Sequence, residues 1–320
     1  MLLLGGLAVG AQKKKSSSRA KPAAKTSKKT TPAKPKPAPT PPPLAPGELP
    51  LAARAAVVLD AKTGEILYGK NPDAMEYPAS TTKILTALLV IEAGDLDRCL
   101  AVERVDTQVE RTALEIKPGE EYARRKLLVA LLLKSANDVA LALARDNAGS
   151  VEAFAAKMNR RAEELGALGS HFTNPHGLHD PHHFTTARDL ARITQAAMQN
   201  PVFREIVSTP EAGITRGEEW VPIRNHNKLL WLLPGCNGVK NGFTNAAQQV
   251  LVSSAIRSGR EAISVVLHTD NPGIWKDSRT LLEHAFAMLG APPIGPAAPP
   301  PEAPAQQGGG QANAASLKND

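Results

Sequence analysis

A serine and a lysine three residues apart precede an apolar stretch of this sequence. They lie in Pro78-Ala-Ser-Thr-Thr-Lys83, and the spacing of the apolar residues that follow predicts a helix over residues 82–91. Residues at i and i+3 share one helix face, about 5–6 Å apart, so Lys83 can contact Ser80. Burial lowers the pKa of an ammonium group, and a neutral lysine beside a serine can act as its base. The structural alternative is that Ser80 caps the helix and Lys83 lies on a solvated face.

Two further short motifs follow in the order and loose spacing of a serine acyl-transfer site. They are Ser135-Ala-Asn137 and Lys240-Asn-Gly242. Their structural alternatives are, respectively, a cap for a helix over residues 139–144 and an ordinary turn. The combination S-x-x-K, S-x-N and K-T-G is the three-part signature of penicillin-binding proteins and class A β-lactamases. The coincidence of three motifs in this order therefore favours catalysis.

The residues around these motifs sharpen the match. The stretches are Tyr77–Lys83, Leu132–Asp138, Asn174-Pro-His-Gly-Leu178 with Thr186-Ala-Arg-Asp189, and Gly238–Thr244. Together they resemble the D-alanyl-D-alanine carboxypeptidase family, the serine-type low-molecular-weight penicillin-binding proteins of peptidase family S11. The resemblance runs from about Ala53 to Leu289 and implies the activity and the fold of that family.

Acyl transfer needs a nucleophile, a base, a proton route to the leaving amine and donors for the oxyanion. Ser80 is the candidate nucleophile, which attacks the carbonyl of the penultimate D-alanine, and Lys83 is its base. Ser135 relays a proton to the leaving nitrogen, while Asn137 holds the peptide bond of the substrate and Lys83. Lys240 supplies positive charge near Ser135 and the substrate carboxylate.

The third motif and its neighbours also supply the expected substrate-binding residues. These are Asn241, Gly242, Phe243 and Thr244. By resemblance, the oxyanion hole consists of the backbone N–H groups of Ser80, at the positive end of its helix, and of Phe243. The chemistry requires no cofactor and no metal.

The sequence departs from its family where the substrate carboxylate is bound. The family usually has threonine at the position of Asn241, often with an arginine at the start of the final helix, where Ile274 stands here. A charged donor is worth about 1.5–3 kcal/mol against roughly 1 kcal/mol for a neutral one. We therefore expect a weaker grip on the carboxylate, with Lys240 and either Arg279 or Arg257 as partial substitutes.

The function that the resemblance implies is hydrolysis of peptidoglycan stem peptides that end in D-Ala-D-Ala, with β-lactam antibiotics as covalent inhibitors. The alternatives are a weakly active penicillin-binding or wall-binding homologue and a D,D-endopeptidase. A class A β-lactamase is disfavoured, because no E-x-x-L-N motif occurs between Asn137 and Lys240.

The alternative interpretation of one histidine-rich loop is a zinc site. Its residues are His176, His179, His182 and His183, with Asp180. Their spacing is irregular for metal ligands, and the stretch 174–178 matches a loop of the resembled family, so we expect no metal. Cys99 and Cys236 lie 137 positions apart; they can pair in an oxidising compartment, and two unpaired buried thiols are the default expectation.

The motifs need elements to position them, and the two ends of the central region supply strands. Residues 54–59 and 64–69 predict one hairpin, and residues 249–256 and 261–268 predict another, with almost only helix between them. We therefore expect an α+β fold, an antiparallel sheet built from both ends of the domain with an inserted helical subdomain. Family resemblance identifies it as β-lactamase/transpeptidase-like and places the three motifs around the intervening cleft.

Several helices are predicted in detail. Residues 127–133 are all apolar, which suits a helix buried on every side. Ser150 is expected to cap one helix, and Thr186 with Asp189 to form a capping-box-like start of another. The last helix is predicted over residues 274–289 and returns to the sheet.

The two ends of the chain differ in composition from its centre. Ten Lys and Arg residues and no Asp or Glu precede Glu48. The net charge of +7 therefore comes from this segment, because the remainder of the chain has 28 basic and 31 acidic residues. We expect an apolar signal-like segment at 1–11, a disordered Lys/Pro/Ala-rich linker at 12–48, the carboxypeptidase domain at 49–290 and a disordered Pro/Ala/Gly/Gln tail at 291–320. The protein is then exported to the periplasm or the outer face of the cytoplasmic membrane. The linker has no aromatic residue for stacking, so weak contact with anionic envelope polymers or lipids is expected and nucleic-acid binding is not.

Overall fold

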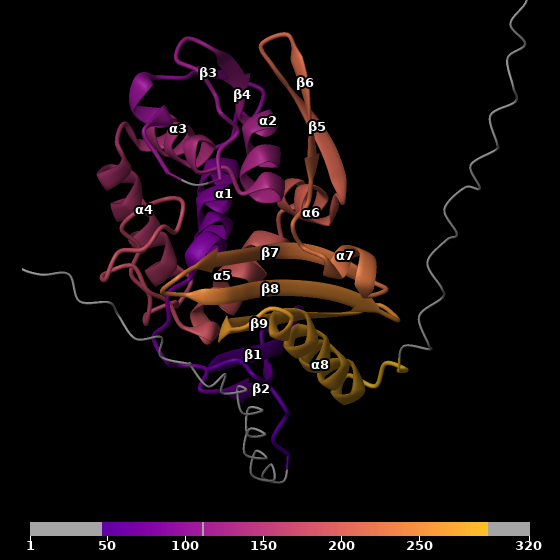
Figure 1. Cartoon of the computed structure of the whole chain (residues 1–320). Helices are drawn as coiled ribbons and strands as arrows, with labels where there is room; N and C mark the ends of the chain where they lie inside the picture. The colour runs from indigo at the N-terminus through magenta and orange to yellow at the C-terminus, as the bar shows by residue number, and fades with distance from the viewer. Residues whose placement is uncertain (1–46, 111, 294–320) are drawn as a thin grey trace, which may run out of the picture. The chain divides into compact units, whose positions relative to one another are not determined.

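A five-stranded antiparallel sheet is the central element of the described residues, 47–110 and 112–293, in the computed structural model (Figure 1). In spatial order its strands are β2 (Ile66–Lys70), β1 (Ala55–Asp60), β9 (Arg260–Thr269), β8 (Gln248–Arg257) and β7 (Cys236–Thr244). Strand β1 pairs with β9, with Ala55 opposite Leu267. Strands from the two ends of the domain therefore form one sheet, which confirms the predicted architecture.

Both predicted hairpins are present. The turn between β1 and β2 is closed by a hydrogen bond from Gly64 N to Asp60 O (2.8 Å). The turn between β8 and β9 places Ser258 and Gly259 at positive φ, the two-residue geometry that matches the twist of paired strands.

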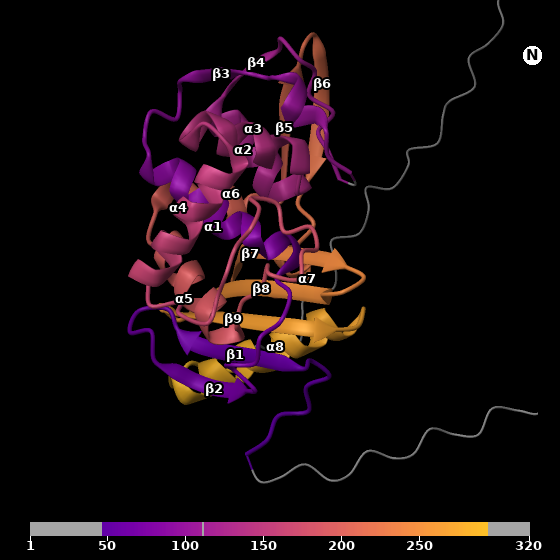
Figure 2. The same cartoon turned by 90° about the vertical axis from the view of Figure 1, so that its left-hand side faces the viewer.

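Strand β8 is buried on both faces and separates two apolar clusters. Val250 and Val252 face the larger cluster, while Leu251 and Ala255 face the smaller one, because successive side chains of a strand alternate between its faces. Helix α8 (Gly273–Met288) covers the smaller cluster, which also includes Leu229 of the short helix α7 (Leu229–Leu232). The remaining helices contribute to the larger cluster on the opposite face (Figure 2).

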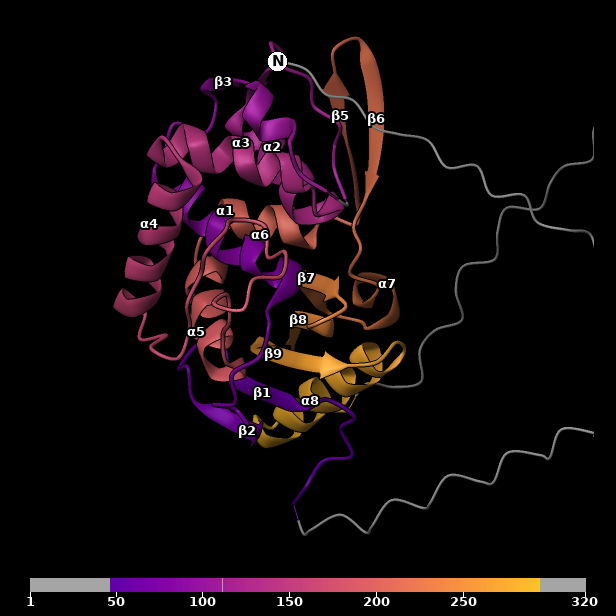
Figure 3. The same ribbon diagram turned by 60° about the vertical axis from the view of Figure 1, so that its left-hand side comes forward.

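The inserted helical part supplies the remaining helices of the described residues (Figure 3). They are α1 (Lys83–Glu92), α2 (Arg124–Val129), α3 (Asn137–Ala148), α4 (Val151–Glu164), α5 (Ala187–Met198), α6 (Pro201–Ser208) and α7 (Leu229–Leu232), with short 3-10 turns at Ala79–Thr82 (η1) and Arg104–Thr107 (η2). The Ser150 hydroxyl accepts from Ala153 N (3.1 Å) and thereby caps α4 as predicted. The Thr186 hydroxyl likewise accepts from Asp189 N (3.0 Å), but the Asp189 carboxylate turns away to Gly169 N (2.7 Å).

The apolar run at 127–133 is buried as predicted but is not one regular helix. Helix α2 ends at Val129, and residues Ala130–Lys134 form a π-helical turn. A π turn accommodates an extra residue, a distortion often found at functional sites. Here it ends in Ser135, which adopts a left-handed conformation (φ 67°).

The prediction of almost only helix between the terminal hairpins was wrong. Strands β3 (Cys99–Ala101) and β4 (Glu121–Ala123) pair, as do β5 (Glu211–Arg216) and β6 (Glu219–Arg224). Strand β7 also lies in this interval and carries the Lys240 motif, so the turn alternative for Asn241-Gly242 was wrong too. Strands β5, β6 and β7 contain glycine, proline or asparagine, which have low strand propensity, while β3 and β4 have only three residues each; strand pairing outweighs these weak local signals.

Most expectations for the chain ends concern residues 1–46 and 294–320, which lie outside the described residues, so the predicted boundaries stay predictions. Among the described residues, no helix is both long and apolar enough to cross a membrane. Cys99 is exposed, so the prediction that it is buried was wrong; Cys236 is partly buried, and its thiol donates to Gly238 O (3.3 Å).

Candidate active site

Ser80 lies in the 3-10 turn η1, directly before α1, where neighbouring backbone is packed against it. Ala79 before it has a left-handed backbone (φ 46°). Two glycines allow the approach: a Cβ on Gly177 would lie 1.8 Å from Ala79 O, and one on Gly242 would lie 2.6 Å from Ser80 N. The third motif and the histidine-rich loop therefore meet at the serine, and Gly242 leaves the Ser80 N–H group uncovered.

Lys83 has no exposed surface, which rules out the solvated-face alternative. Its Nζ lies 3.1 Å from Ser80 Oγ, and it donates to Asn137 Oδ1 (2.7 Å) and to His176 O (2.7 Å). Burial holds the pKa of Lys83 well below its usual value of 10.5, and the charge of Lys240 lowers it further. The charge of Asp138 acts in the opposite direction. The balance favours the neutral amine.

Asn137 is the first residue of α3, and its side chain does not cap that helix. Its Nδ2 donates to Glu110 O (3.1 Å) while its Oδ1 accepts from Lys83, which fixes the orientation of the amide. Ser135 is 6% exposed at the end of the π-helical turn. The structure thus brings the second motif to the first, and the cap alternative does not hold for Asn137.

Asp138, the residue after Asn137, has a supporting function that the sequence did not reveal. Its carboxylate accepts from Leu114 N (2.9 Å), Glu115 N (2.7 Å) and Ile116 N (3.2 Å). These bonds anchor the segment beside the Asn137 side chain to the start of α3. A buried carboxylate is tolerated here because backbone donors satisfy it.

Lys240 is the second buried lysine of the site, only 1% exposed. Burial lowers its pKa from 10.5 to about 7, and its Nζ donates to Asn241 O (2.9 Å). It lies opposite Val252 on β8, so its side chain faces the larger apolar cluster and the helical part. Asn241, the next residue on the strand, faces the other side.

The remaining two predicted substrate-binding residues lie at the end of β7. Phe243 is 47% exposed, whereas the Thr244 hydroxyl accepts from Ala247 N (3.0 Å) and stabilises the turn into β8. Thr244 also lines a cavity of about 360 Å³, together with Glu110, Leu178, His179, Asn245 and Ala246.

The histidine-rich loop supports the site through its backbone. His176 O accepts from Lys83, and Pro175 O accepts from the Thr86 hydroxyl (2.7 Å). The two buried rings are held by protein groups: His183 Nδ1 accepts from Thr173 N (3.0 Å), its Nε2 pairs with the Thr82 hydroxyl (2.8 Å), and His176 Nδ1 accepts from Leu178 N (3.1 Å). Burial lowers the pKa of His183 to about 4 and that of His176 to about 3.

That arrangement does not support the zinc alternative. Both ring nitrogens of His183 are used in hydrogen bonds, so this ring has no lone pair free for a metal. Within the part of the chain that the structure describes, no group of three His, Cys, Asp or Glu side chains is arranged to hold a metal ion.

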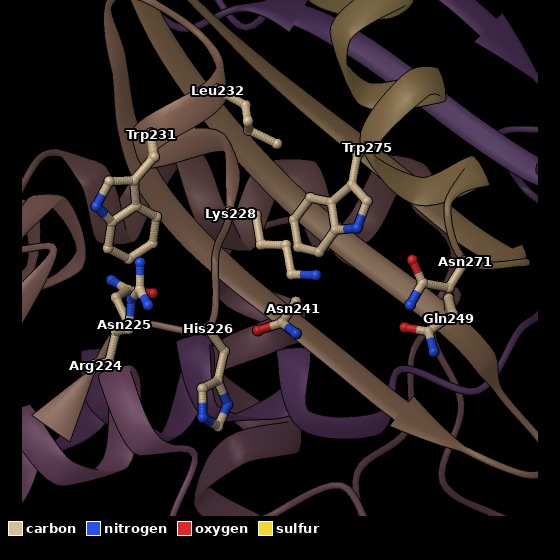
Figure 4. Close-up of a pocket in the computed structure, with 10 residues that line it drawn as sticks. All are labelled: Arg224, Asn225, His226, Lys228, Trp231, Leu232, Asn241, Gln249, Asn271 and Trp275. Atoms are coloured by element: carbon tan, nitrogen blue, oxygen red, sulfur yellow. The ribbon is translucent and has the colours of Figure 1, made fainter. Parts of the chain in front are cut away.

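A larger cavity, of about 650 Å³, adjoins the site at Asn241 (Figure 4). It is lined by Arg224, Asn225, His226, Lys228, Trp231, Leu232, Asn241, Gln249, Asn271 and Trp275. Along the sequence of β7, Asn241 lines this cavity and Thr244 lines the smaller one, with Gly242 and Phe243 between them. Sequence reasoning missed the residues from Arg224 to Leu232, because the segment carries no recognisable motif and reaches the site only through the packing of β6 and α7.

The structure places neither Arg257 nor Arg279, two of the expected substitutes for the carboxylate-binding arginine, at the large cavity, while the role of Lys240, the third, stays a prediction. Ile274 is 1% exposed and packs in the smaller apolar cluster, while its neighbour Trp275 lines the cavity instead. Arg257 donates to Glu283 (2.7 Å) and stacks on Phe286, and Arg279 lies 4.0 Å from Glu283. None of the three side chains lines the large cavity.

The fold and the geometry around Ser80 define the class of the chain: serine acyl-transfer proteins of the penicillin-binding type, in which a lysine, not a histidine, stands beside the serine. A family model of D-alanyl-D-alanine carboxypeptidases matches residues 42–271. The D-alanyl-D-alanine carboxypeptidase DacB2 of Mycobacterium tuberculosis is 37% identical over 242 residues, which cover 74% of this chain and 83% of that protein. A D-alanyl-D-alanine endopeptidase of Pseudomonas aeruginosa is 34% identical over 63% of this chain and 66% of its own length.

Solved structures agree with these sequence matches. The Streptomyces K15 DD-transpeptidase superposes with a TM-score of 0.71 at 30% identity, covering 75% of this chain and 99% of that one. The chain belongs to the D-alanyl-D-alanine carboxypeptidase family of serine hydrolases, the low-molecular-weight penicillin-binding proteins. This confirms the resemblance that the motifs carried.

Proposed function

We propose that this chain is a serine-type D-Ala-D-Ala carboxypeptidase, which removes the terminal D-alanine from peptidoglycan stem peptides through an acyl-enzyme. The observation that carries the proposal is the environment of Lys83. A lysine with no exposed surface lies 3.1 Å from the Ser80 hydroxyl and donates to two oxygens that can only accept. Such an arrangement is unfavourable for a purely structural lysine and suits a base.

The hydrogen-bond capacity of a neutral amine fits these three partners. Its two N–H groups donate to Asn137 Oδ1 and His176 O, and its lone pair is then directed to the Ser80 hydroxyl. Ser80 Oγ attacks the carbonyl carbon of the penultimate D-alanine while Lys83 takes its proton. The backbone N–H groups of Ser80 and Phe243 stabilise the oxyanion.

Collapse of the tetrahedral intermediate requires a proton at the leaving nitrogen. Ser135 relays this proton, and Lys240, whose pKa of about 7 leaves it partly charged at neutral pH, supplies positive charge beside the relay. The C–N bond then breaks and D-alanine leaves. Water hydrolyses the ester, again with Lys83 as base, and restores the Ser80 hydroxyl.

The edge of β7 is the proposed binding surface for the peptide. This strand is the last of the sheet and has one strand partner, β8. An extended peptide can add to such an edge through main-chain hydrogen bonds. Asn241, Gly242, Phe243 and Thr244 then form the wall along which the D-Ala-D-Ala segment lies.

Related activities and the compartment follow from the same proposal. D,D-endopeptidase activity is the alternative reaction, because one relative is an endopeptidase and both reactions break an amide on the carboxyl side of a D-alanine. β-Lactams acylate Ser80, since the lactam carbonyl takes the place of the scissile amide. The substrate lies in the cell envelope, which implies export of the chain and allows weak contact of the basic linker with anionic polymers or lipids.

Intact-mass spectrometry after incubation with a penicillin tests the nucleophile. We expect one adduct per chain, its loss in Ser80→Ala and its full retention in Ser150→Ala, a matched change at the remote cap of α4. Release of D-alanine from a D-Ala-D-Ala peptide is measured in parallel. An adduct that survives in Ser80→Ala, or an acylated wild type that releases no D-alanine, would contradict the proposal and favour a different nucleophile or a non-catalytic homologue.

A further inference from the structure

A buried histidine that the proposed mechanism does not use is hydrogen-bonded to the nucleophile motif. His183 is only 2% exposed. Its Nε2 lies 2.8 Å from the hydroxyl of Thr82, the residue that directly precedes Lys83. Polar groups that are removed from water are nearly always hydrogen-bonded, so the partners of both ring nitrogens decide what this side chain does.

The second ring nitrogen fixes the direction of that hydrogen bond. His183 Nδ1 lies 3.0 Å from the backbone N of Thr173 and 3.3 Å from the hydroxyl of the same residue. A backbone N–H group can only donate, so Nδ1 accepts and the ring proton is on Nε2. Burial lowers the pKa of His183 to about 4, which keeps the ring neutral near pH 7. His183 therefore donates to the Thr82 hydroxyl.

The ring is also held from the helical part of the molecule. Phe172 contacts it edge-on, with 5.4 Å between the ring centroids. The backbone of Phe172 is bonded twice to the side chain of Asn159 on α4: its N donates to Oδ1 (2.7 Å), and its O accepts from Nδ2 (2.8 Å). These contacts tie the position of the His183 ring to α4 and not to its own loop alone.

The Thr82 hydroxyl serves this contact and not its usual purpose. Thr82 lies at the junction of η1 and α1, where a threonine side chain often caps the helix, and its side chain does not cap α1. A Cβ on Gly177 would lie 2.8 Å from Thr82 Oγ1, so the glycine leaves room for the hydroxyl. The local structure thus directs the threonine to the histidine.

The bond to Thr82 is a third tie between the start of α1 and this loop. The other two are the bonds that Lys83 and Thr86 donate to its backbone carbonyl groups. Thr82 lies between Ser80 and Lys83 in the turn, so a shift of Thr82 changes the direction of both side chains. A displacement of about 1 Å can cost about 10²-fold in rate, and the distance at stake is the 3.1 Å between Lys83 Nζ and Ser80 Oγ.

We propose that His183 is a positioning residue for the nucleophile: its Nε2–H group donates to Thr82 and thereby fixes the rotation of the turn that carries Ser80 and Lys83. It acts through Thr82 and takes no part in proton transfer. The inference rests on the proposed acyl transfer at Ser80 and assigns to it a residue outside the three motifs. Loss of this bond should slow acylation while the affinity for the ligand changes little.

Asparagine and glutamine at position 183 separate this hydrogen bond from the packing of the ring. The amide of glutamine reaches the position of Nε2 and can donate to Thr82, whereas that of asparagine reaches only the position of Nδ1 and can accept from Thr173. The partner variants are Thr82→Val, which removes the hydroxyl at similar shape, and Thr82→Ser, which keeps it. The matched control is His182→Asn, at the exposed histidine next in the same loop.

Rapid-mixing acylation of the full chain by a penicillin gives the acylation rate constant separately from the dissociation constant of the preceding complex. We expect His183→Asn and Thr82→Val each to lower the rate constant about 10- to 100-fold, with little change in the dissociation constant. His183→Gln and Thr82→Ser should restore most of the rate, and His182→Asn should keep both constants within about threefold. The double variant His183→Asn/Thr82→Val should be no slower than the slower single variant, because both changes remove one bond.

Equal acylation rates of His183→Asn and His183→Gln, both with a melting temperature near that of the wild type, would overturn the inference, because the ring would then act through packing. A double variant whose loss is the product of the two single losses would overturn it too. Should His183→Asn not fold, Thr82→Val against Thr82→Ser makes the same comparison from the other end of the bond. These results leave the proposed function intact, whereas a wild type that forms no adduct overturns both.

Discussion

Lys83 and Lys228 lie in opposite environments. Lys83 has no exposed surface and three oxygen atoms within hydrogen-bond distance. Lys228 is exposed, lies over the Trp275 ring and has no carboxylate of the described residues beside it. Because water stabilises an ammonium and a buried site does not, burial suits Lys83 to act as a base, whereas Lys228 keeps its contact with water.

The difference extends to the surroundings of each lysine. The Ser80 region is fixed by close backbone contacts, including those that only Gly177 and Gly242 permit. The Lys228 region is an open cavity lined by side chains from β6, α7, β7, β8 and α8. Chemistry needs fixed distances, and the close backbone packing around Ser80 supplies them, whereas the cavity beside Lys228 is open space.

The largest expected effect is the difference between arginine substitutions at Lys83 and at Lys228. Lys83→Arg places a cation there that cannot deprotonate near neutral pH, so acylation by a penicillin should slow by about 10²–10⁴. Lys228→Arg keeps the positive charge of an exposed side chain that is not needed as a base and should lower kcat/KM for the peptide substrates by less than about tenfold. Stopped-flow or mass-resolved acylation rates measure the first, and peptide assays the second.

An equal loss of activity on arginine substitution at Lys83 and at Lys228 would contradict this difference between the two lysines. An Lys83→Arg variant that is acylated at nearly the wild-type rate would show that Lys83 acts as a charge. The melting temperature of each variant separates loss of chemistry from loss of the fold.

A smaller effect is expected from adding a methyl group at Gly242, where the backbone packs against Ser80. In Gly242→Ala the new methyl group would lie 2.6 Å from Ser80 N, where the oxyanion should bind. Loss of one oxyanion donor typically costs 10²–10³ in rate, and we expect acylation to fall by about that factor with little change in KM. The control is Gly259→Asn in the β8–β9 turn, which has open space and a positive φ that asparagine tolerates. A Gly242→Ala variant of normal activity would place the oxyanion elsewhere.

The smallest effect concerns the pH dependence of the free energy of unfolding, which reports the burial of Lys240. The pKa of Lys240 is about 7 in the folded chain and 10.5 ordinarily, so the unfolded chain binds more protons between these values. The free energy of unfolding should therefore rise with pH in that window, and Lys240→Met should reduce the slope between pH 7 and 9 by roughly 1 kcal/mol per pH unit. Urea titrations at several pH values measure both slopes; identical slopes in the wild type and Lys240→Met would mean that Lys240 is not buried as an amine.

Much of this organisation was predictable from local sequence. The hairpins at residues 54–69 and 249–268 follow from apolar strands around turn residues, and the cap at Ser150 follows from its side chain. The spacing of Ser80 and Lys83 already brings them to one face. Where the pattern is weak, prediction failed: β7 contains two glycines and two asparagines, and its pairing with β8 is what makes it a strand.

The sequence by itself determined which chemical groups the chain has and their order, because short motifs carry their own local geometry. Tertiary structure alone decided the partners, burial and protonation of those groups. Asn137 and His176 are 54 and 93 positions from Lys83, and only folding brings their oxygens to its amine and removes the water that would keep it charged. Folding likewise buried Ile274 and turned Trp275 and Lys228 to the cavity, since burial and contact depend on the packing of distant elements.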